Sequence, residues 1–254
     1  MIASAAISDY LHRIGYTGSR EPTAQTLHNL HRAHMLSVPF ENLDISLGRK
    51  IVCEEEGFLR KIVEQRRGGF CYELNGALAA LLRELGFKVT LLSARVPRDD
   101  GSPSPEFDHL TLRVDLEEPW LADVGFGDLS NGPLRLETGR EQEQDGRKFR
   151  IVEQDGRLQL DRTEPDGNWK RQYSFTLVPR RLDEFAPMCL YHQTSPESPF
   201  TRKKVCSMAT PDGRITVTDR RLIITRKGER KERLLNSEDE WQSALAEYFG
   251  VILG

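Results

Sequence analysis

The sequence predicts an α+β fold, with a helical N-terminal part, an antiparallel β part and a shorter mixed C-terminal part. Three observations predict it. Apolar residues recur at the helical period up to about residue 86, and they alternate at period two from Phe87 onward. Asp-Gly pairs then separate short apolar runs, which is typical of strands joined by tight turns. A capping box finally precedes an apolar stripe near the C-terminus. We therefore expect three domains, 1–86, 87–190 and 191–254.

The amino-acid composition is typical of a globular protein. The 254 residues are 38% hydrophobic and 30% charged, and the net charge of -3 gives no reason to expect nucleic acid or an anionic membrane as partner. Four cysteines without a C-x-x-C pair favour reduced, intracellular thiols. The N-terminus does not resemble a signal peptide, and the run Ala77–Leu82 is far too short to span a bilayer. We expect a cytoplasmic protein, with its oligomeric state left open.

Helical spacing predicts the first two elements. Apolar residues within 7–14 form one stripe, and Pro22 is expected in the first turn of a second helix. That helix contains His28, His31 and His34, a spacing that raises the question of a metal site. No Glu or Cys follows at ligand spacing, and His31 and His34 lie among leucines. We therefore interpret the three as packing histidines and expect no metal.

The stretch Arg67–Asn75 (R-G-G-F-C-Y-E-L-N) is the centre of the functional prediction. Its paired glycines permit a tight turn, including positive φ, directly before Cys71. Leucines at helical spacing predict a helix that begins there, and Gly86 suits the position after its end. The unpaired N–H groups of a helix start favour a thiolate, which is the nucleophilic form of cysteine. One apolar stripe runs along this helix: Leu74, Leu78, Leu81, Leu82 and Leu85.

Two predicted strands bring a histidine and an aspartate together. Residues 107–114 and 120–124 alternate at period two, and the connection 115–119 suits a hairpin. An antiparallel pairing folded at that connection makes His109 and Asp123 cross-strand neighbours, within one or two residues of register.

The remaining chain predicts a meander and a final helix. The meander could curl into a barrel or remain an open sheet. A short helix is expected over 182–190, a hairpin over 205–218, a strand over 222–225, and a last helix capped by Ser237-x-x-Glu240. The meander's turns are the three Asp-Gly pairs Asp145-Gly146, Asp155-Gly156 and Asp166-Gly167.

Cys71, His109 and Asp123 together are the set that nucleophilic acyl transfer requires. His109 would accept the thiol proton, and Asp123 would hold the imidazole in one tautomer. Each residue alone has a structural interpretation, as a buried cysteine, a structural histidine or a turn cap, and the combination favours catalysis. After Asp123, Gly125 and Gly127 would let the backbone approach a ligand closely, although a simple turn explains them equally well.

Five segments of this sequence resemble the signatures of the arylamine N-acetyltransferase family. The stretch R-G-G-F-C-Y-E-L-N resembles that family's active-cysteine motif, and the other segments occur in the expected order along nearly the whole chain. Besides 67–75, they are 38–44 (V-P-F-E-N-L-D), 107–110 (F-D-H-L), 123–127 (D-V-G-F-G) and 194–200 (T-S-P-E-S-P-F).

The resemblance implies a fold and a reaction. The fold would be a helical domain carrying the nucleophile (1–86), an antiparallel β-barrel domain carrying the histidine and aspartate (87–190), and an α/β lid (191–254), with a core like papain-type cysteine proteases and transglutaminases. Acetyl-coenzyme A would be the acyl donor, no metal would be needed, and small aromatic amines or hydrazines would accept the acetyl group after an acetyl-cysteine forms. O-acetylation of N-hydroxyarylamines stays open.

The resemblance also implies residue roles. Cys71 would be the nucleophile, His109 the base and Asp123 the orienting acid. Phe40 and Phe126 would line the aromatic acceptor pocket, with Phe200 near the cleft.

Further contacts are expected around this set. By the same resemblance, Glu41 and Arg67 would form a supporting ion pair. We expect Gly125 and Gly127 to approach the coenzyme. The basic run at residues 202–204 could meet coenzyme A phosphates or be simply solvated. A cysteine hydrolase or amidase with the same triad is the alternative function.

Overall fold

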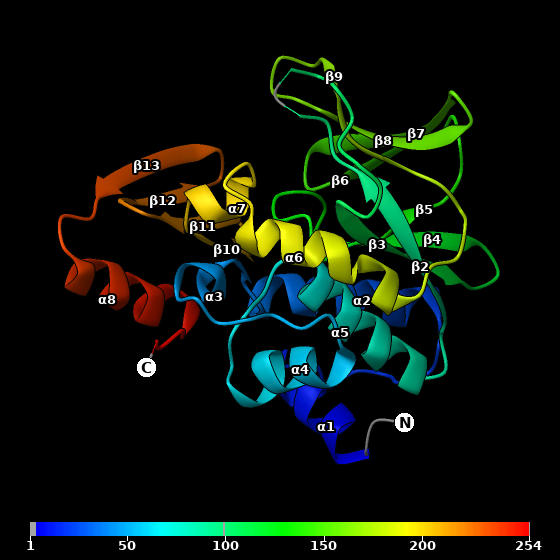
Figure 1. The fold of residues 1–254 in the computed structure, drawn as a ribbon. Coiled ribbons are helices and arrows are strands. Elements are labelled where there is room, and N and C mark those ends of the chain that lie inside the picture. Colours follow the sequence, from blue (N-terminus) through cyan, green and yellow to red (C-terminus); the bar gives the residue numbers. More distant parts are fainter. Residues whose placement is uncertain (1–3, 99, 254) are drawn as a thin grey trace.

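A computed structural model describes residues 4–98 and 100–253 of the chain. Figure 1 shows the N-terminal helices gathered along one side of two separate sheets, with the helices α6 and α7 running between those sheets. The expected α+β architecture is confirmed. Within the described ranges, no helix is both long and apolar enough to cross a membrane.

The N-terminal part consists of short helices around one buried helix. The second helix begins after Thr23, whose side chain accepts a hydrogen bond from the Thr26 amide. Pro22 therefore precedes the cap and does not lie in the first turn, because a threonine hydroxyl is the better N-cap. The elements are α1 (Ser4–Arg13), α2 (Ala24–Ser37), α3 (Leu43–Ser46), α4 (Glu55–Leu59), the π-helical turn η1 (Arg60–Glu64) and α5 (Cys71–Glu84).

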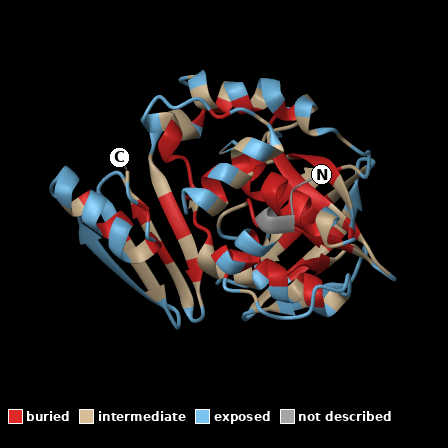
Figure 2. Ribbon diagram, turned by 90° about the horizontal axis from the view of Figure 1, so that it is seen from below, coloured by how far each residue is buried: buried red, intermediate tan, exposed pale blue. Residues whose placement is uncertain are grey.

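Helix α5 is the core of the molecule. The predicted leucine stripe is buried from Leu74 to Leu82, and the alanines and Gly76 between those leucines are buried as well. Gly86 has φ +88 directly after the helix, as its predicted place requires. Figure 2 shows this buried helix enclosed by neighbouring elements. Since α5 is buried on every face from Cys71 to Leu82, packing fixes the position of its first residue.

The larger sheet is a nearly closed antiparallel barrel. Its strand order is β5-β4-β3-β2-β9-β8-β7-β6. The edge strands β5 and β6 are joined through side chains, because Gln142 bonds both the amide and the carbonyl of Arg135, at 2.7 and 2.9 Å. The strands are β2 (Lys88–Arg95), β3 (His109–Asp115), β4 (Pro119–Ala122), β5 (Leu134–Arg135), β6 (Glu141–Gln144), β7 (Arg147–Gln154), β8 (Arg157–Thr163) and β9 (Trp169–Phe175).

The Asp-Gly pairs make the predicted turns between β6, β7, β8 and β9. At Asp145-Gly146 and Asp155-Gly156 both residues have positive φ, the geometry of a two-residue type I′ hairpin. The chain then leaves the barrel through the expected helical segment. This segment begins at the predicted residue and runs further than 190, as the 3₁₀ turn η2 (Leu182–Phe185) and the helices α6 (Ala186–Thr194) and α7 (Pro199–Arg202).

The smaller sheet lies beside the barrel and contains one strand from the N-terminal part. Strand β1 (Phe40–Glu41) pairs antiparallel with β10, so the expectation of an all-helical N-terminal part is wrong at this point. Two residues are too few to produce an alternating pattern. The remaining elements are β10 (Val205–Thr210), β11 (Gly213–Thr218), β12 (Arg221–Arg226), β13 (Glu229–Leu234) and the helix α8 (Glu238–Phe249).

Helix α8 begins with half of the predicted capping box. The Ser237 hydroxyl accepts the Glu240 amide at 3.2 Å. The Glu240 carboxylate returns to the amide of Asn236 at 3.0 Å and not to that of Ser237.

A buried cluster of five ionisable side chains joins β1, α3, η1 and α5. The Arg67 guanidinium contacts Glu41 at 2.7 Å and Asp44 at 3.1 Å. The Lys61 ammonium contacts Asp44 and Glu73, both at 2.8 Å. Burial by itself lowers the pKa of Lys61, but the surrounding carboxylates raise it overall, so the lysine stays charged. The Glu41–Arg67 pair expected from the sequence is thus one part of a larger network.

Replacement of Glu41 by Gln tests the cost of that network. The change leaves the buried Arg67 short of one opposite charge, and we expect a loss of about 3 kcal/mol in the free energy of unfolding, measured by urea denaturation. The matched control is Glu137→Gln, which breaks the exposed pair of Glu137 with Arg140. That control should change stability by less than about 0.5 kcal/mol. Equal effects of the two substitutions on stability would contradict a stabilising role of the Glu41 charge in the buried network.

Candidate active site

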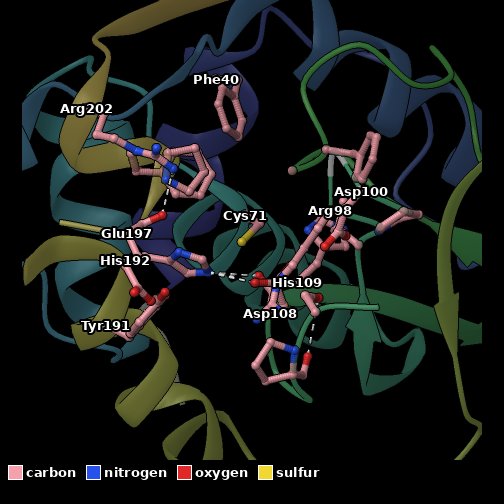
Figure 3. A pocket seen from close by; sticks show the side chains of 18 residues that line it. Phe40, Cys71, Arg98, Asp100, Asp108, His109, Tyr191, His192, Glu197 and Arg202 are labelled. Carbon is pink, nitrogen blue, oxygen red and sulfur yellow. Dashed lines mark hydrogen bonds and ion pairs between the residues drawn. The ribbon is translucent and has the colours of Figure 1, made fainter. Parts of the chain in front are cut away.

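A cavity of about 620 Å³ lies between the start of α5, the barrel and the segment from α6 to α7. Figure 3 shows Cys71 at its centre, with Phe40, His109 and His192 around it. The lining residues are Phe40, Cys71, Val96, Pro97, Arg98, Asp100, Ser104, Pro105, Asp108, His109, Gly125, Phe126, Tyr191, His192, Glu197, Pro199, Phe200 and Arg202. Most of this surface comes from side chains far apart in the sequence.

Cys71 is the first residue of α5, as predicted, but its two preceding glycines act differently from expectation. Neither Gly68 nor Gly69 has positive φ. A Cβ on Gly68 would lie 1.9 Å from the Pro39 carbonyl oxygen, and one on Gly69 would lie 2.6 Å from the Glu73 Cβ. The glycines are therefore required by close packing of this turn against β1 and against α5.

His109 lies between the other two members of the predicted triad. Its Nε2 is 2.7 Å from Oδ2 of Asp123, and the Cys71 thiol lies close enough to the histidine for each group to shift the pKa of the other. Asp123 directly follows β4, and the pairing Leu112↔Ala122 places it two residues from the position opposite His109. The predicted register and neighbourhood are confirmed.

The triad carries a positive charge on its histidine. Burial lowers the pKa of His109, but the charge and hydrogen bond of Asp123, with the bond to Cys71, raise it to about 10. Burial raises the pKa of Asp123, but the charge of His109 and the hydrogen bonds to the carboxylate lower it by more, so that the net shift is downward. At neutral pH the pair is therefore a carboxylate with an imidazolium.

The thiol of Cys71 is subject to opposing effects. Burial raises its pKa, and this exceeds the lowering produced by the hydrogen bond and charge of His109 and by the backbone of Leu110. The helix start alone does not favour the thiolate as the sequence suggested, since the group is only 3% exposed. The thiolate can form only beside the imidazolium.

Asn75, the last residue of the cysteine motif, holds the triad in position. Its Nδ2 donates to the Leu110 carbonyl at 2.6 Å and to Asp123 Oδ1 at 2.9 Å. Its Oδ1 accepts the Val124 amide at 2.9 Å. Sequence reasoning quoted this residue without giving it a role. Its signal was its place one turn after Cys71, on the same face of the helix.

All three predicted aromatic residues line the cavity. The Phe126 ring stands edge-on to His109 with centroids 5.3 Å apart, and Phe40 and Phe200 are 6.3 Å apart. Asn42 holds the segment of Phe200, because its Nδ2 donates to the carbonyls of Phe200 and Lys203 at 2.9 and 2.7 Å. The 38–44 segment, whose role the residue pattern alone left open, thus both lines the site and anchors it.

Gly125 and Gly127 differ in their places. The amide of Gly125 donates to Asp123 Oδ1 at 3.0 Å, and the residue lines the cavity. A Cβ there would lie 2.7 Å from Asn75 Nδ2 and 2.8 Å from the Cys71 Cα. Gly127 has φ +87, which accounts for glycine in this turn, and it does not line the cavity. Contact of either residue with a coenzyme stays a prediction.

The basic run at 202–204 divides between two environments. Arg202 lines the cavity, where its guanidinium donates to the backbone of Glu197 and Ser198. The ammonium of Lys204 lies 4.4 Å from the Trp241 ring centroid and so packs on α8.

A second histidine, His192 of α6, lies on the opposite wall. Its Nε2 is 3.3 Å from Oδ1 of Asp108, the neighbour of the triad histidine, and its ring stands edge-on to Phe200. This pair couples α6 to the start of β3. No sequence pattern marks it, because His192 is one histidine on a short helix.

The three histidines of α2 pack against protein groups. The His31 Nε2 accepts the Asp123 amide at 3.3 Å, and His34 Nδ1 bonds the Tyr10 hydroxyl at 3.0 Å. The ring of His28 stands edge-on to Trp120. Burial lowers the pKa of His31 to about 4, so its ring is neutral and can accept. Among the side chains that the structure describes, no group of three or more His, Cys, Asp or Glu could hold a metal ion.

Comparison with known proteins agrees with this geometry. The family model described as N-acetyltransferase matches residues 23–254. An arylamine N-acetyltransferase of Mycolicibacterium smegmatis is 35% identical over 98% of this chain and 92% of its own length. The chain belongs to the arylamine N-acetyltransferase family. The human arylamine N-acetyltransferase 1 is 33% identical, over 97% of this chain and 94% of its own.

Solved arylamine N-acetyltransferase structures have the same fold. The Salmonella typhimurium enzyme superposes with a TM-score of 0.93 at 30% identity, covering 98% of this chain and 92% of its own. The Mycobacterium marinum enzyme in complex with CoA superposes with a TM-score of 0.90 at 32% identity, covering 96% and 92%. The resemblance carried by the five sequence segments is therefore confirmed at the level of family and fold.

Gly125→Ala tests the close approach of the loop to α5. Since the new Cβ would meet the Cys71 backbone and Asn75, we expect a loss of about 2 kcal/mol in stability and slower alkylation of Cys71 by iodoacetamide. In the control Gly57→Ala the Cβ would lie 3.6 Å from Glu54, an ordinary contact within α4, and stability should rise by about 0.5 kcal/mol. An unaffected Gly125→Ala protein would refute the packing explanation.

Asp123→Asn tests the charge on His109. The raised pKa of about 10 means that the imidazolium stabilises the fold fully below pH 6.5, and that this stabilisation is lost as pH rises toward 10. We expect the stability difference between native and variant protein to be largest below pH 6.5 and to shrink toward pH 10, in urea unfolding. Alkylation of Cys71 at neutral pH should slow by about tenfold or more for each unit by which its pKa rises. Parallel pH–stability curves would contradict the charged pair.

Proposed function

We propose that this chain transfers the acetyl group of acetyl-coenzyme A to arylamines and arylhydrazines, through an acetyl-cysteine on Cys71. One observation carries the proposal: the sulfur, imidazole and carboxylate of Cys71, His109 and Asp123 form a connected set inside a largely apolar cavity. Its relatives are arylamine N-acetyltransferases, one of them solved in complex with CoA, which supports this acceptor class and this donor. They give no support to a cysteine hydrolase.

In the first half-reaction, the Cys71 thiolate attacks the thioester carbonyl of the donor. The imidazolium of His109 then gives its proton to the departing coenzyme A thiolate, which leaves neutral His109 beside acetyl-Cys71. Attacking and leaving groups are both thiols of similar basicity, so this exchange is close to balanced. The amide of Cys71, in the first turn of α5 where backbone amides lack partners within the helix, is one donor for the transient oxyanion.

In the second half-reaction, neutral His109 removes a proton from the amine as its nitrogen attacks the acetyl-cysteine. The Cys71 thiolate leaves, and the thiolate–imidazolium pair is restored with the acetamide as product. Asp123 keeps the imidazole oriented in both halves through its contact with Nε2. The same steps would acetylate the oxygen of an N-hydroxyarylamine.

The walls of the cavity favour an aromatic acceptor over water. Cys71 and His109 are each 3% exposed, so few water molecules can reach the acetyl group. The rings of Phe40, Phe126 and Phe200 supply flat apolar surface on the open side. An aromatic amine gains by burying its ring there, and water gains nothing.

Two arginines and a glycine of the cavity wall suit contacts with acetyl-coenzyme A. Arg98 and Arg202 line the cavity and suit the phosphates of coenzyme A, while Gly125 leaves its backbone open to the thioester end. We retain the three domains 1–86, 87–190 and 191–254 as a proposal. The four free thiols support our further proposal that the protein acts in the cytoplasm.

Intact-mass analysis after mixing with acetyl-coenzyme A, without an acceptor, tests the reaction. We expect a persistent single acetyl adduct that peptide mapping places on Cys71, and its discharge on addition of an aniline. Cys71→Ser should form no adduct and keep the native unfolding midpoint. Cys53→Ser, the control, should acetylate as the native chain does. Immediate release of acetate without an adduct, or an adduct in Cys71→Ser, would overturn the proposal.

A further inference from the structure

Two cysteines outside the active site meet in the fold. Cys53 lies in the loop between α3 and α4, and Cys189 lies on α6, far away in the sequence. The neighbouring Cys53 thiol, together with burial, raises the pKa of Cys189, and Gln193 contacts both the Cys189 sulfur and the carbonyl of Ile51, two residues before Cys53. Cys189 is 1% exposed, whereas Cys53 is partly exposed and its sulfur donates to the Leu182 carbonyl at 3.5 Å. The pair thus has one accessible thiol and one buried thiol.

The side chain of Gln193 holds the two segments in this arrangement. Gln193, one turn after Cys189 on α6, accepts the Ile51 amide at 2.7 Å and donates to the Ile51 carbonyl at 3.0 Å. Its Nε2 also lies 3.3 Å from the Cys189 sulfur. Because Ile51 is only two residues from Cys53, these two hydrogen bonds hold the α3–α4 loop beside Cys189. The meeting of the two thiols is therefore built into the packing.

The other two cysteines have different surroundings. Cys71 lies beside His109 in the active site. Cys206 is fully buried in the smaller sheet and packs in a separate core with Val217 and Leu245. Of these four free thiols, Cys53 and Cys189 are the neighbours that the Gln193 contacts bring together.

We propose that Cys53 and Cys189 form a redox modification site, at which low-molecular-weight disulfides such as oxidised glutathione convert the dithiol into an intramolecular disulfide. The Cys53 thiolate attacks one sulfur of glutathione disulfide, which releases one glutathione and leaves a mixed disulfide on Cys53. The Cys189 sulfur then attacks the Cys53 sulfur and expels the second glutathione, whose thiolate takes up the proton that Cys189 loses. The protein loses two electrons and two protons, and glutathione disulfide gains them as two thiols.

The bond would lock one wall of the active-site cavity. Helix α6 carries Tyr191 and His192, which face the cavity opposite His109 (Figure 3). A covalent link from Cys189 to the α3–α4 loop adds to the clamp made by Gln193 and restricts movement of that helix. The link also closes a long loop of chain, which lowers the entropy of the unfolded state. This proposal does not depend on the acetyl-transfer reaction.

The test uses the full chain with Cys71→Ser, so that the active-site thiol cannot react. After native incubation with oxidised glutathione, we expect a mass lower by two hydrogens, without bound glutathione. Non-reducing peptide mapping should join the peptides of Cys53 and Cys189. The unfolding midpoint should rise by roughly 5 °C and return on reduction with dithiothreitol.

Matched variants separate the two steps. Adding Cys189→Ala should trap one glutathione on Cys53, because the second attack is impossible, while adding Cys53→Ser should leave a chain that takes up none. Adding Cys206→Ser should still give the disulfide. Persistent glutathione on Cys53 with Cys189 present, a bond to any other cysteine, or no reaction at Cys53 would each overturn the proposal.

Discussion

The buried amide of Asn75 is the contact on which the active-site geometry depends. It bonds the carbonyl of β3 one residue after His109, the carboxylate of Asp123, and the amide that follows Asp123. One side chain of α5 thus fixes both strands that supply the other two members of the triad. Because each of its bonds is buried, each is expensive to leave unmade, and the helix and the strands have one low-energy arrangement.

The reactivity of Cys71 results from competition between burial and one neighbouring charge. A thiol in this position would ordinarily stay protonated, since burial raises its pKa. Asp123 opposes this effect indirectly, because it keeps His109 charged, and the imidazolium is the partner that a buried thiolate needs. The same burial that opposes the thiolate also protects an acetyl-cysteine from water. Low exposure is therefore a cost to the first half of the reaction and a benefit to the second.

The N-terminal part of the chain contributes more than the nucleophile. Strand β1 enters the smaller sheet, brings Phe40 to the cavity, and carries Glu41 into the buried charge cluster. Asn42 bonds the backbone at Phe200, so that two rings of the acceptor pocket are held by one short segment. Segments distant in sequence are thereby tied into one site. The cluster around Arg67 is costly to bury, and every one of its charges meets an opposite charge at short distance.

Sequence patterns predict the class of fold, the helix that begins at Cys71 and the hairpin that brings His109 near Asp123. These features follow from local periodicity, turn residues and the two-residue repeat of strands, which act over a few residues and are visible in the sequence. The other features become visible only in the folded protein. The roles of Asn75 and Lys61, the strand at Phe40–Glu41, the pairing of His192 with Asp108 and the need for glycine at 68 and 69 depend on contacts between distant segments. Such contacts depend on which distant elements pack together, and that arrangement has no periodic signature in the sequence.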